Sequence, residues 1–179
     1  MKKIFILLLS VSLFIVGCSN GNSPQTQFEK VMKQIKEGNT LEVEKLNNIF
    51  NSNDAEPMKG GFEKITYKIN DVEVKGNAAV INTTITVPDI TPWMDEYIKE
   101  MSPAIAKAEQ EGKSQAEIDA DIKIKEMKAK FFKDKFKNEK LTYKDRTIEV
   151  NMKKEDGKWV LEKGNNDNFV YTVATFGLR

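Results

Sequence analysis

The apolar positions that follow the N-terminal segment recur with the period of a helix. A stripe with 3.6-residue spacing follows Ser23 and Pro24, a typical N-cap and first helical position, and Gly38 ends it. The stripe consists of Phe28, Val31, Met32 and Ile35. A second apolar stripe over residues 41–50 predicts another helix directly afterwards. The sequence therefore predicts a pair of helices before any strand.

The pattern then changes to the two-residue alternation of strands. Residues 51–61 hold a proline and two adjacent glycines and are expected to form a loop. Alternation over residues 65–74 slips by one position near residues 70–71, which predicts a β-bulge. Residues 75–77 predict a hairpin turn, and alternation resumes over residues 79–88.

Residues 91–138 are expected to be helical, with a break at Gly112 and a capping box formed by Ser114 and Glu117. The helix expected over residues 115–137 carries apolar ridges on nearly opposite sides and needs cover on both. One ridge comprises Ile118, Ile122, Ala129, Phe132 and Phe136, and the other Ile124, Met127 and Phe131. Either the sheet and the preceding helix cover both ridges, or the second ridge is left for a partner.

The last third of the chain returns to strands. Apolar and polar residues alternate over 148–152, which predicts a strand. Asp156-Gly157 predicts a turn, and residues 159–161 predict the returning strand. A short final helix ends at Gly177. The predicted fold is α+β: a curved antiparallel sheet of about four strands wrapped on N-terminal helices, with the long helical insertion between the second and third strands.

Three segments together resemble small bacterial lipoproteins with a nuclear-transport-factor-two-like (cystatin-like) domain. They are the helix–Gly-Asn–helix opening at 28–39, the long hairpin at 65–85 and the ending Glu155-Asp156-Gly157-Lys158-Trp159. The resemblance implies that the curved sheet leaves a cavity at its open end. Relatives use that cavity for catalysis, small-molecule binding or association, and the fold does not choose among these.

The first seventeen residues are typical of an export signal. Lys2 and Lys3 precede an apolar run over residues 4–16, which is shorter than the about 20 residues of a membrane-spanning helix. Ile15-Val16-Gly17-Cys18 resembles the bacterial lipobox. The resemblance implies cleavage between Gly17 and Cys18 and a diacylglyceryl group on the Cys18 sulfur; the alternative is an uncleaved membrane helix.

These features divide the chain into a signal peptide (1–17), a lipidated flexible tether (18–25) and a single α+β domain (26–179) with its helical insertion at 91–138. The mature protein is expected at the cell membrane, lipid-anchored on the extracytoplasmic face. Two acyl chains anchor a protein stably, whereas one binds only marginally.

Composition excludes several classes of chemistry. The formal charge is 28 − 27 = +1, and removing residues 1–17 takes two lysines and no acid, which leaves −1. This balance gives no argument for a nucleic-acid partner. The chain has no histidine and one cysteine, which excludes Ser–His–Asp and Cys–His catalysis, the usual zinc sites and an internal disulfide. No cofactor is expected.

Three acids are candidates for carboxylate-dependent catalysis by position: Asp71, Glu73 and Asp95. Exposed acids are the ordinary interpretation of all three, so no catalytic residue is assigned. The run at residues 165–168 is rich in side-chain oxygen, but its one aspartate favours helix capping by Asn166 or Asp167 over calcium, and no metal ligand is assigned.

The expected function is a non-enzymatic module that binds an unknown ligand or surface protein, with no specific activity assigned; the alternative is a carboxylate-dependent isomerase- or lyase-like enzyme that uses the sheet cavity. Trp93 and Tyr97, one turn apart, are the candidate residues of a binding cleft. Residues 123–140 hold eight lysines and three acids, and could contact lipid or wall polymer or form a solvated face.

We expect wild-type protein to enter the detergent phase on phase partitioning, because acylated Cys18 supplies two apolar chains. The Cys18→Ala variant has no sulfur to acylate and is expected to lose both processing and anchoring. Wild-type protein that stays wholly aqueous, or a variant anchored as before, would contradict the assignment.

Overall fold

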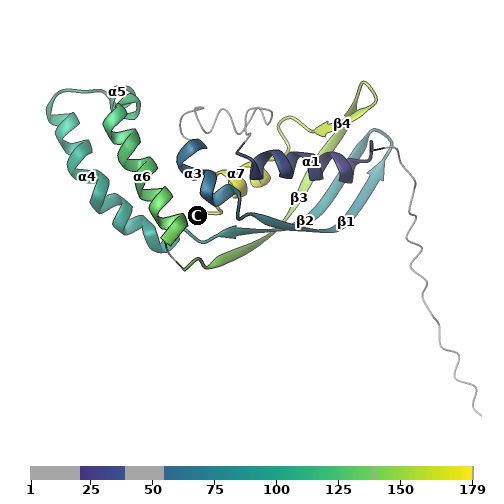
Figure 1. Cartoon of the computed structure of the whole chain (residues 1–179). Coiled ribbons are helices and arrows are strands. Elements are labelled where there is room, and N and C mark those ends of the chain that lie inside the picture. The colour runs from purple at the N-terminus through teal and green to yellow at the C-terminus, as the bar shows by residue number, and fades with distance from the viewer. Residues whose placement is uncertain (1–20, 39–54, 139, 179) are drawn as a thin grey trace, which may run out of the picture.

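The computed structural model describes residues 21–38, 55–138 and 140–178 (Figure 1). The signal peptide, Cys18 with the next two tether residues, and the second predicted helix at 41–50 lie outside the described residues.

Four antiparallel strands form one sheet in the order β1-β2-β3-β4 (Figure 1). The strands are β1 (Thr66–Lys75), β2 (Ala78–Pro88), β3 (Tyr143–Glu155) and β4 (Lys158–Leu161). Tight turns join β1 to β2 and β3 to β4, whereas the helical insertion joins β2 to β3. The α+β class, the four antiparallel strands and the position of the insertion are therefore confirmed.

The predicted β-bulge is present in β1, where the pairing with β2 shifts between Ile69 and Asp71. Asn70 is the extra residue. Its Nδ2 donates hydrogen bonds to Asn82 Oδ1 at 2.9 Å and to Thr84 Oγ1 at 3.0 Å. The side chain of the extra residue thus fastens the bulge to the neighbouring strand.

Helices α1 (Pro24–Lys36), α3 (Ala55–Phe62) and α7 (Asp167–Thr175) lie over one face of the sheet (Figure 1). The α1 stripe predicted from its spacing supplies three fully buried side chains. The core between these helices and the sheet is apolar and rich in aromatic rings; its members include Phe28, Met32, Ile35, Phe62, Ile81, Ile85, Val150, Phe169, Val173 and Phe176.

Helix α3 corrects the prediction of a loop through residue 61. Its Gly60-Gly61 pair indicated a break, but the pair lets α3 approach the core closely. A Cβ atom on Gly61 would overlap the rings of Phe136 and Phe176. Tertiary packing therefore outweighs the low helix propensity of glycine at this point.

The insertion forms a helical arm that projects from the end of the sheet (Figure 1). It comprises a 3₁₀ turn (Thr91–Trp93), α4 (Met94–Gln110), α5 (Gln115–Ala120) and α6 (Ile122–Asn138). Ser114 and Glu117 form the predicted capping box.

The single helix predicted over residues 115–137 is wrong, because the chain breaks at Asp121. This residue is extended, with ψ 117°, and its Oδ1 accepts a hydrogen bond from the backbone N–H of Lys123 at 3.0 Å. The Asp121 carboxylate also pairs with Lys113 Nζ at 2.7 Å. Ile122, assigned to an apolar ridge, is consequently 73% exposed at the start of α6.

Both apolar ridges of α6 are nevertheless covered at its C-terminal half. Phe132 and Phe136 join the main core, and Phe131 on the other ridge is only 4% exposed. The ring of Phe131 meets that of Tyr97 of α4 edge-on, with centroids 5.4 Å apart. This geometry supports internal packing of the second ridge.

Asp89 fixes the point where the chain leaves β2 for the arm. Its carboxylate accepts a hydrogen bond from the Thr91 backbone N–H at 2.9 Å and pairs with Lys144 Nζ of β3 at 2.8 Å. Burial raises the pKa of Asp89, but the hydrogen bonds from Lys144 and Thr91 outweigh burial and lower it below its ordinary value. The stabilisation of the folded chain by the Asp89 carboxylate is therefore complete above the ordinary pKa of an aspartate. It is lost as the pH falls through the lowered pKa.

Phe131→Asp is expected to lower the free energy of unfolding by more than about 3 kcal/mol, because it removes a buried ring and places an unpaired charge in its site. Chemical denaturation measures this. Ile122→Asp is the matched control, since it makes the same apolar-to-acidic change at an exposed site of the same helix. Equal stability of Phe131→Asp and wild type would contradict the packing and favour a partner surface.

Candidate functional site

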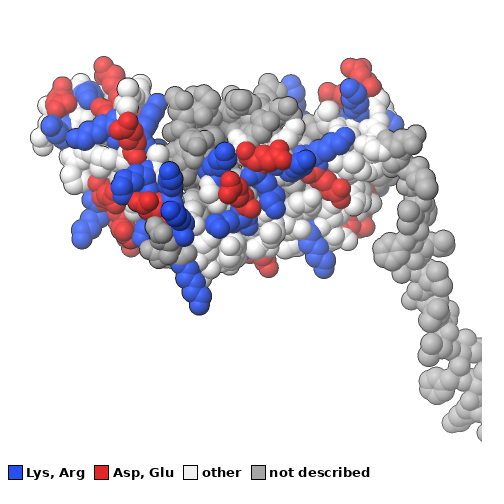
Figure 2. Space-filling model, in the orientation of Figure 1, with Lys and Arg blue, Asp and Glu red and all other residues white. Residues whose placement is uncertain are grey.

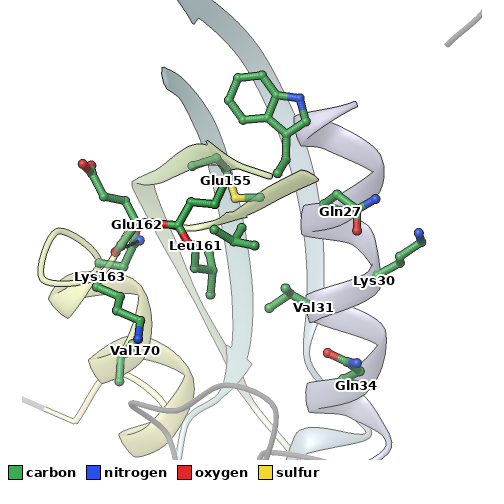
Figure 3. Close-up of a pocket in the computed structure, with 13 residues that line it drawn as sticks. Gln27, Lys30, Val31, Gln34, Glu155, Leu161, Glu162, Lys163 and Val170 are labelled. Carbon is green, nitrogen blue, oxygen red and sulfur yellow. Dashed lines mark hydrogen bonds between the residues drawn. The ribbon is translucent and has the colours of Figure 1, made fainter. Parts of the chain in front are cut away.

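A cleft of about 400 Å³ lies between α1, β4 and α7, beside the β3–β4 hairpin (Figure 3). Its apolar lining comprises Val31, Met152, Trp159, Val160, Leu161 and Val170. Its polar lining comprises Gln27, Lys30, Gln34, Glu155, Glu162, Lys163 and Asn166. An apolar floor with a few polar groups around it is the usual composition of a small-molecule site.

Helix α1 contributes through a second stripe beside the one that enters the core. Gln27, Val31 and Gln34 recur at the spacing of one helix face and line the cleft, with Val31 pointing into it in Figure 3. Gln27 also donates from Nε2 to the carbonyl of Gly21 at 3.1 Å. The helix thus has one face for the core and an adjacent face for the cleft.

Strand β4 contributes Trp159, the one aromatic ring among the described residues that line the cleft. Trp159 pairs with Lys154 of β3, and Leu161 pairs with Met152, so these four side chains share one face of the hairpin. Trp159 is 7% exposed. Lys154 Nζ lies 6.0 Å from the Trp159 ring centroid, at the outer range of a cation–π contact.

The far wall of the cleft depends on Asn166. This side chain is 3% exposed, and its Oδ1 accepts a hydrogen bond from the backbone N–H of Asn151 at 2.8 Å. Its Nδ2 donates to the carbonyl of Asn151 at 2.9 Å and to that of Glu162 at 3.0 Å. One side-chain amide therefore engages both backbone groups of a β3 residue, directly after β4 has ended.

The helix-capping role expected for Asn166 is wrong in its detail. Asn166 occupies the N-cap position of α7, but its side chain makes no capping hydrogen bond. Its backbone carbonyl accepts the first helical hydrogen bond, from Val170 N–H at 2.9 Å. The side chain instead bonds to the backbone of Asn151 in β3, and the residue thereby fixes the start of α7 relative to the sheet.

The acids of the cleft lie at its rim. Glu155 is exposed and pairs with Lys153 Nζ at 3.6 Å, and Glu162 accepts a hydrogen bond from Asn165 Nδ2 at 2.9 Å. Within the described ranges, the buried polar side chains are Thr83, Asn166 and Thr172, none of which ionises near neutral pH.

The predicted cleft residues Trp93 and Tyr97 lie elsewhere, at the base of the arm. Trp93 is 7% exposed and meets Phe136 edge-on, with centroids 5.2 Å apart. Tyr97 is half-buried, with its ring 5.3 Å from that of Phe132. These contacts place both rings in a packed aromatic cluster because α6 folds back beside α4.

The three candidate acids do not converge. Asp71, Glu73 and Asp95 are all exposed, and Glu73 pairs with Lys75 Nζ at 3.4 Å. Asn165, Asp167 and Asn168 line a separate polar hollow of about 550 Å³ beside β3. No group of three or more acidic, histidine or cysteine side chains that could hold a metal occurs in the part of the chain that the structure describes.

The lysines of α6 point in several directions. Lys135 pairs with Glu96 of α4 at 2.6 Å, and Lys130 pairs with Asp134 at 2.7 Å. Lys133 and Lys137 line a hollow of about 750 Å³ between α6 and α3. On the face shown in Figure 2, basic and acidic side chains are interspersed.

No protein-family model matches the chain, and no curated protein matches it. The chain is similar to a crystal structure of a candidate lipoprotein (ycdA) from Bacillus subtilis, with 15% identity and a TM-score of 0.40. The match covers 85% of this chain and 46% of that chain, so this chain spans about half the length of that protein.

No helix within the described ranges is both long enough and apolar enough to span a bilayer.

Proposed function

We propose that this chain is a lipid-anchored extracytoplasmic protein that binds an amphipathic ligand in the α1–β4–α7 cleft. The anchor rests on the lipobox-like tetrapeptide ending at Cys18 and on the basic start and apolar run before it. The resemblance to nuclear-transport-factor-two-like domains is supported by the sheet with α1 and α7 over one face.

The observation that carries the binding proposal is the composition of the cleft. Trp159, Leu161 and Val31 offer apolar surface for an aliphatic or aromatic group. Lys30 and Glu155 bring charges of both signs to the same cleft, and Gln34 brings an amide. A ligand with an apolar part and a polar end would match the apolar and polar parts of this lining.

Binding without chemical transformation is supported by where the acids lie. A carboxylate-dependent isomerase or lyase needs an acid held away from water at the reacting atom. Glu155 and Glu162 stand at the rim, and the buried polar groups described above are not acids. The absence of histidine removes the commonest acid–base catalyst at neutral pH.

The test is calorimetric titration of lysophosphatidylglycerol, below its micelle concentration, into the mature chain carrying Cys18→Ala. Val31→Phe is expected to weaken binding about tenfold or more, about 1.4 kcal/mol of binding free energy, because the larger ring occupies cleft volume that the ligand would fill. The matched control is Val74→Phe, the same change at a 53% exposed site on β1, and it is expected to leave the affinity unchanged.

Equal affinities of wild type and Val31→Phe would contradict the cleft as the binding site. Chemical conversion of the lysophospholipid by the purified chain would favour the enzymatic alternative. Unchanged thermal stability of Val31→Phe serves as the check that lost affinity does not come from unfolding.

A further inference from the structure

We propose that one end of the sheet, the hairpin end, lies against the lipid headgroups of the membrane and that the helical arm points away from it. The hairpin end comprises residues 21–24 at the start of α1 and residues 73–78 and 153–158 around the two hairpin turns. This inference rests on the proposed anchor at Cys18 and adds an orientation and a lipid-contacting surface to it.

The first observation is how the chain enters the domain. Asn22 donates from Nδ2 to the carbonyl of Gly157, in the β3–β4 turn, at 2.7 Å. Ser23 caps α1 by accepting a hydrogen bond from the Thr26 N–H at 3.1 Å. Four residue steps separate Cys18 from Asn22, and a fully extended chain spans at most about 14 Å over four residues. The acyl anchor therefore cannot lie far from this turn.

The second observation is the length of the sheet. Strand β2 runs from Ala78, at the hairpin end, to Pro88, where the chain turns into the arm. At about 3.4 Å per residue, its two ends are about 34 Å apart. The arm extends beyond the far end, opposite the point where the chain enters (Figure 1). Because the short tether attaches at one end of this long body, it favours the orientation in which the hairpin end faces the membrane and the arm points away.

The third observation is the charge of the hairpin end. It carries Lys75, Lys153, Lys154 and Lys158 against Glu73, Glu155 and Asp156, a balance of 4 − 3 = +1 in a mature chain of −1. Basic side chains close to a membrane are attracted by anionic lipid within a Debye length. This attraction is too small to recruit the protein alone, but it acts on an orientation that the anchor already favours.

The orientation bears on the cleft, because its lining includes Gln27, in the first turns of α1, and Trp159, next to the β3–β4 turn. A ligand with an acyl chain could then enter from the headgroup region without crossing open water.

Energy transfer to labelled headgroups tests this orientation. The lipidated full chain is reconstituted in vesicles of phosphatidylcholine and phosphatidylglycerol that carry an acceptor dye on the headgroup. Acylation blocks the thiol of Cys18, so a maleimide donor labels only an introduced cysteine. Asn77→Cys places the donor at the hairpin end, and Glu109→Cys places it on the arm. We expect transfer to be several-fold higher from residue 77 than from residue 109.

Equal transfer from the two sites, or higher transfer from residue 109, would overturn the orientation while leaving the anchor intact. Failure of both labelled proteins to float with the vesicles would instead contradict the anchor, and with it the basis of this inference.

The headgroup contact has its own control. The triple variant Lys75→Gln, Lys154→Gln, Lys158→Gln is expected to bring the two transfer values closer together, as is added salt. Lys107→Gln, Lys123→Gln, Lys128→Gln removes the same charge from the arm and is expected to preserve the difference. Identical behaviour of the two triple variants would contradict a specific lipid contact by the hairpin end.

Discussion

The cleft depends on the side-chain amide of Asn166, which bonds to the backbone of β3 where β4 has ended. The pairing of β4 with β3 ends at Leu161, and one more backbone hydrogen bond runs from Glu162 N–H to the Asn151 carbonyl at 2.9 Å. Without Asn166, the Asn151 N–H would face the unpaired edge. The amide of Asn166 bonds to the N–H and the carbonyl of Asn151 and to the Glu162 carbonyl, so both of its N–H donors and its oxygen have partners inside the protein. A buried amide left without partners would cost about 1–3 kcal/mol, which makes this arrangement selective for asparagine.

This interaction links the three elements around the cleft. It holds the connection after β4 against β3, and its backbone carbonyl begins α7, which brings Val170 to the cleft wall. Helix α1 forms the other wall, and the Asn22–Gly157 hydrogen bond ties its start to the same hairpin. The shape of the cleft thus follows from contacts at both ends of a hairpin whose second strand has only four residues.

Much of the fold follows from local patterns in the sequence. The two-residue alternation and its slip at Asn70 gave β1 with its bulge, and the spacing of Phe28, Met32 and Ile35 gave the buried face of α1. Long-range packing decides the elements that local patterns missed. Gly61 indicates a break in isolation, and only the rings of Phe136 and Phe176 against it explain a helix there.

The candidate site was less predictable for the same reason. Trp93 and Trp159 each lie near the end of an expected element, and the local sequence does not distinguish a packed ring from a cleft ring. The Phe136 ring that packs against Trp93 comes from α6, far along the chain, whereas the short β4 leaves Trp159 next to a hollow. The signal that could have identified the cleft is the stripe Gln27, Val31 and Gln34 beside the core stripe of α1.

The most direct test of this account is backbone amide hydrogen exchange of Asn151 in Asn166→Ala, with the exposed neighbour Asn165→Ala as control. Loss of the Asn166 side chain is expected to accelerate exchange at Asn151 about tenfold or more, corresponding to a lost hydrogen bond of about 1–3 kcal/mol, and to weaken binding in the cleft. Asn165→Ala is expected to leave Asn151 protected. Unchanged protection of Asn151 in Asn166→Ala would contradict the claim that this amide holds the cleft together.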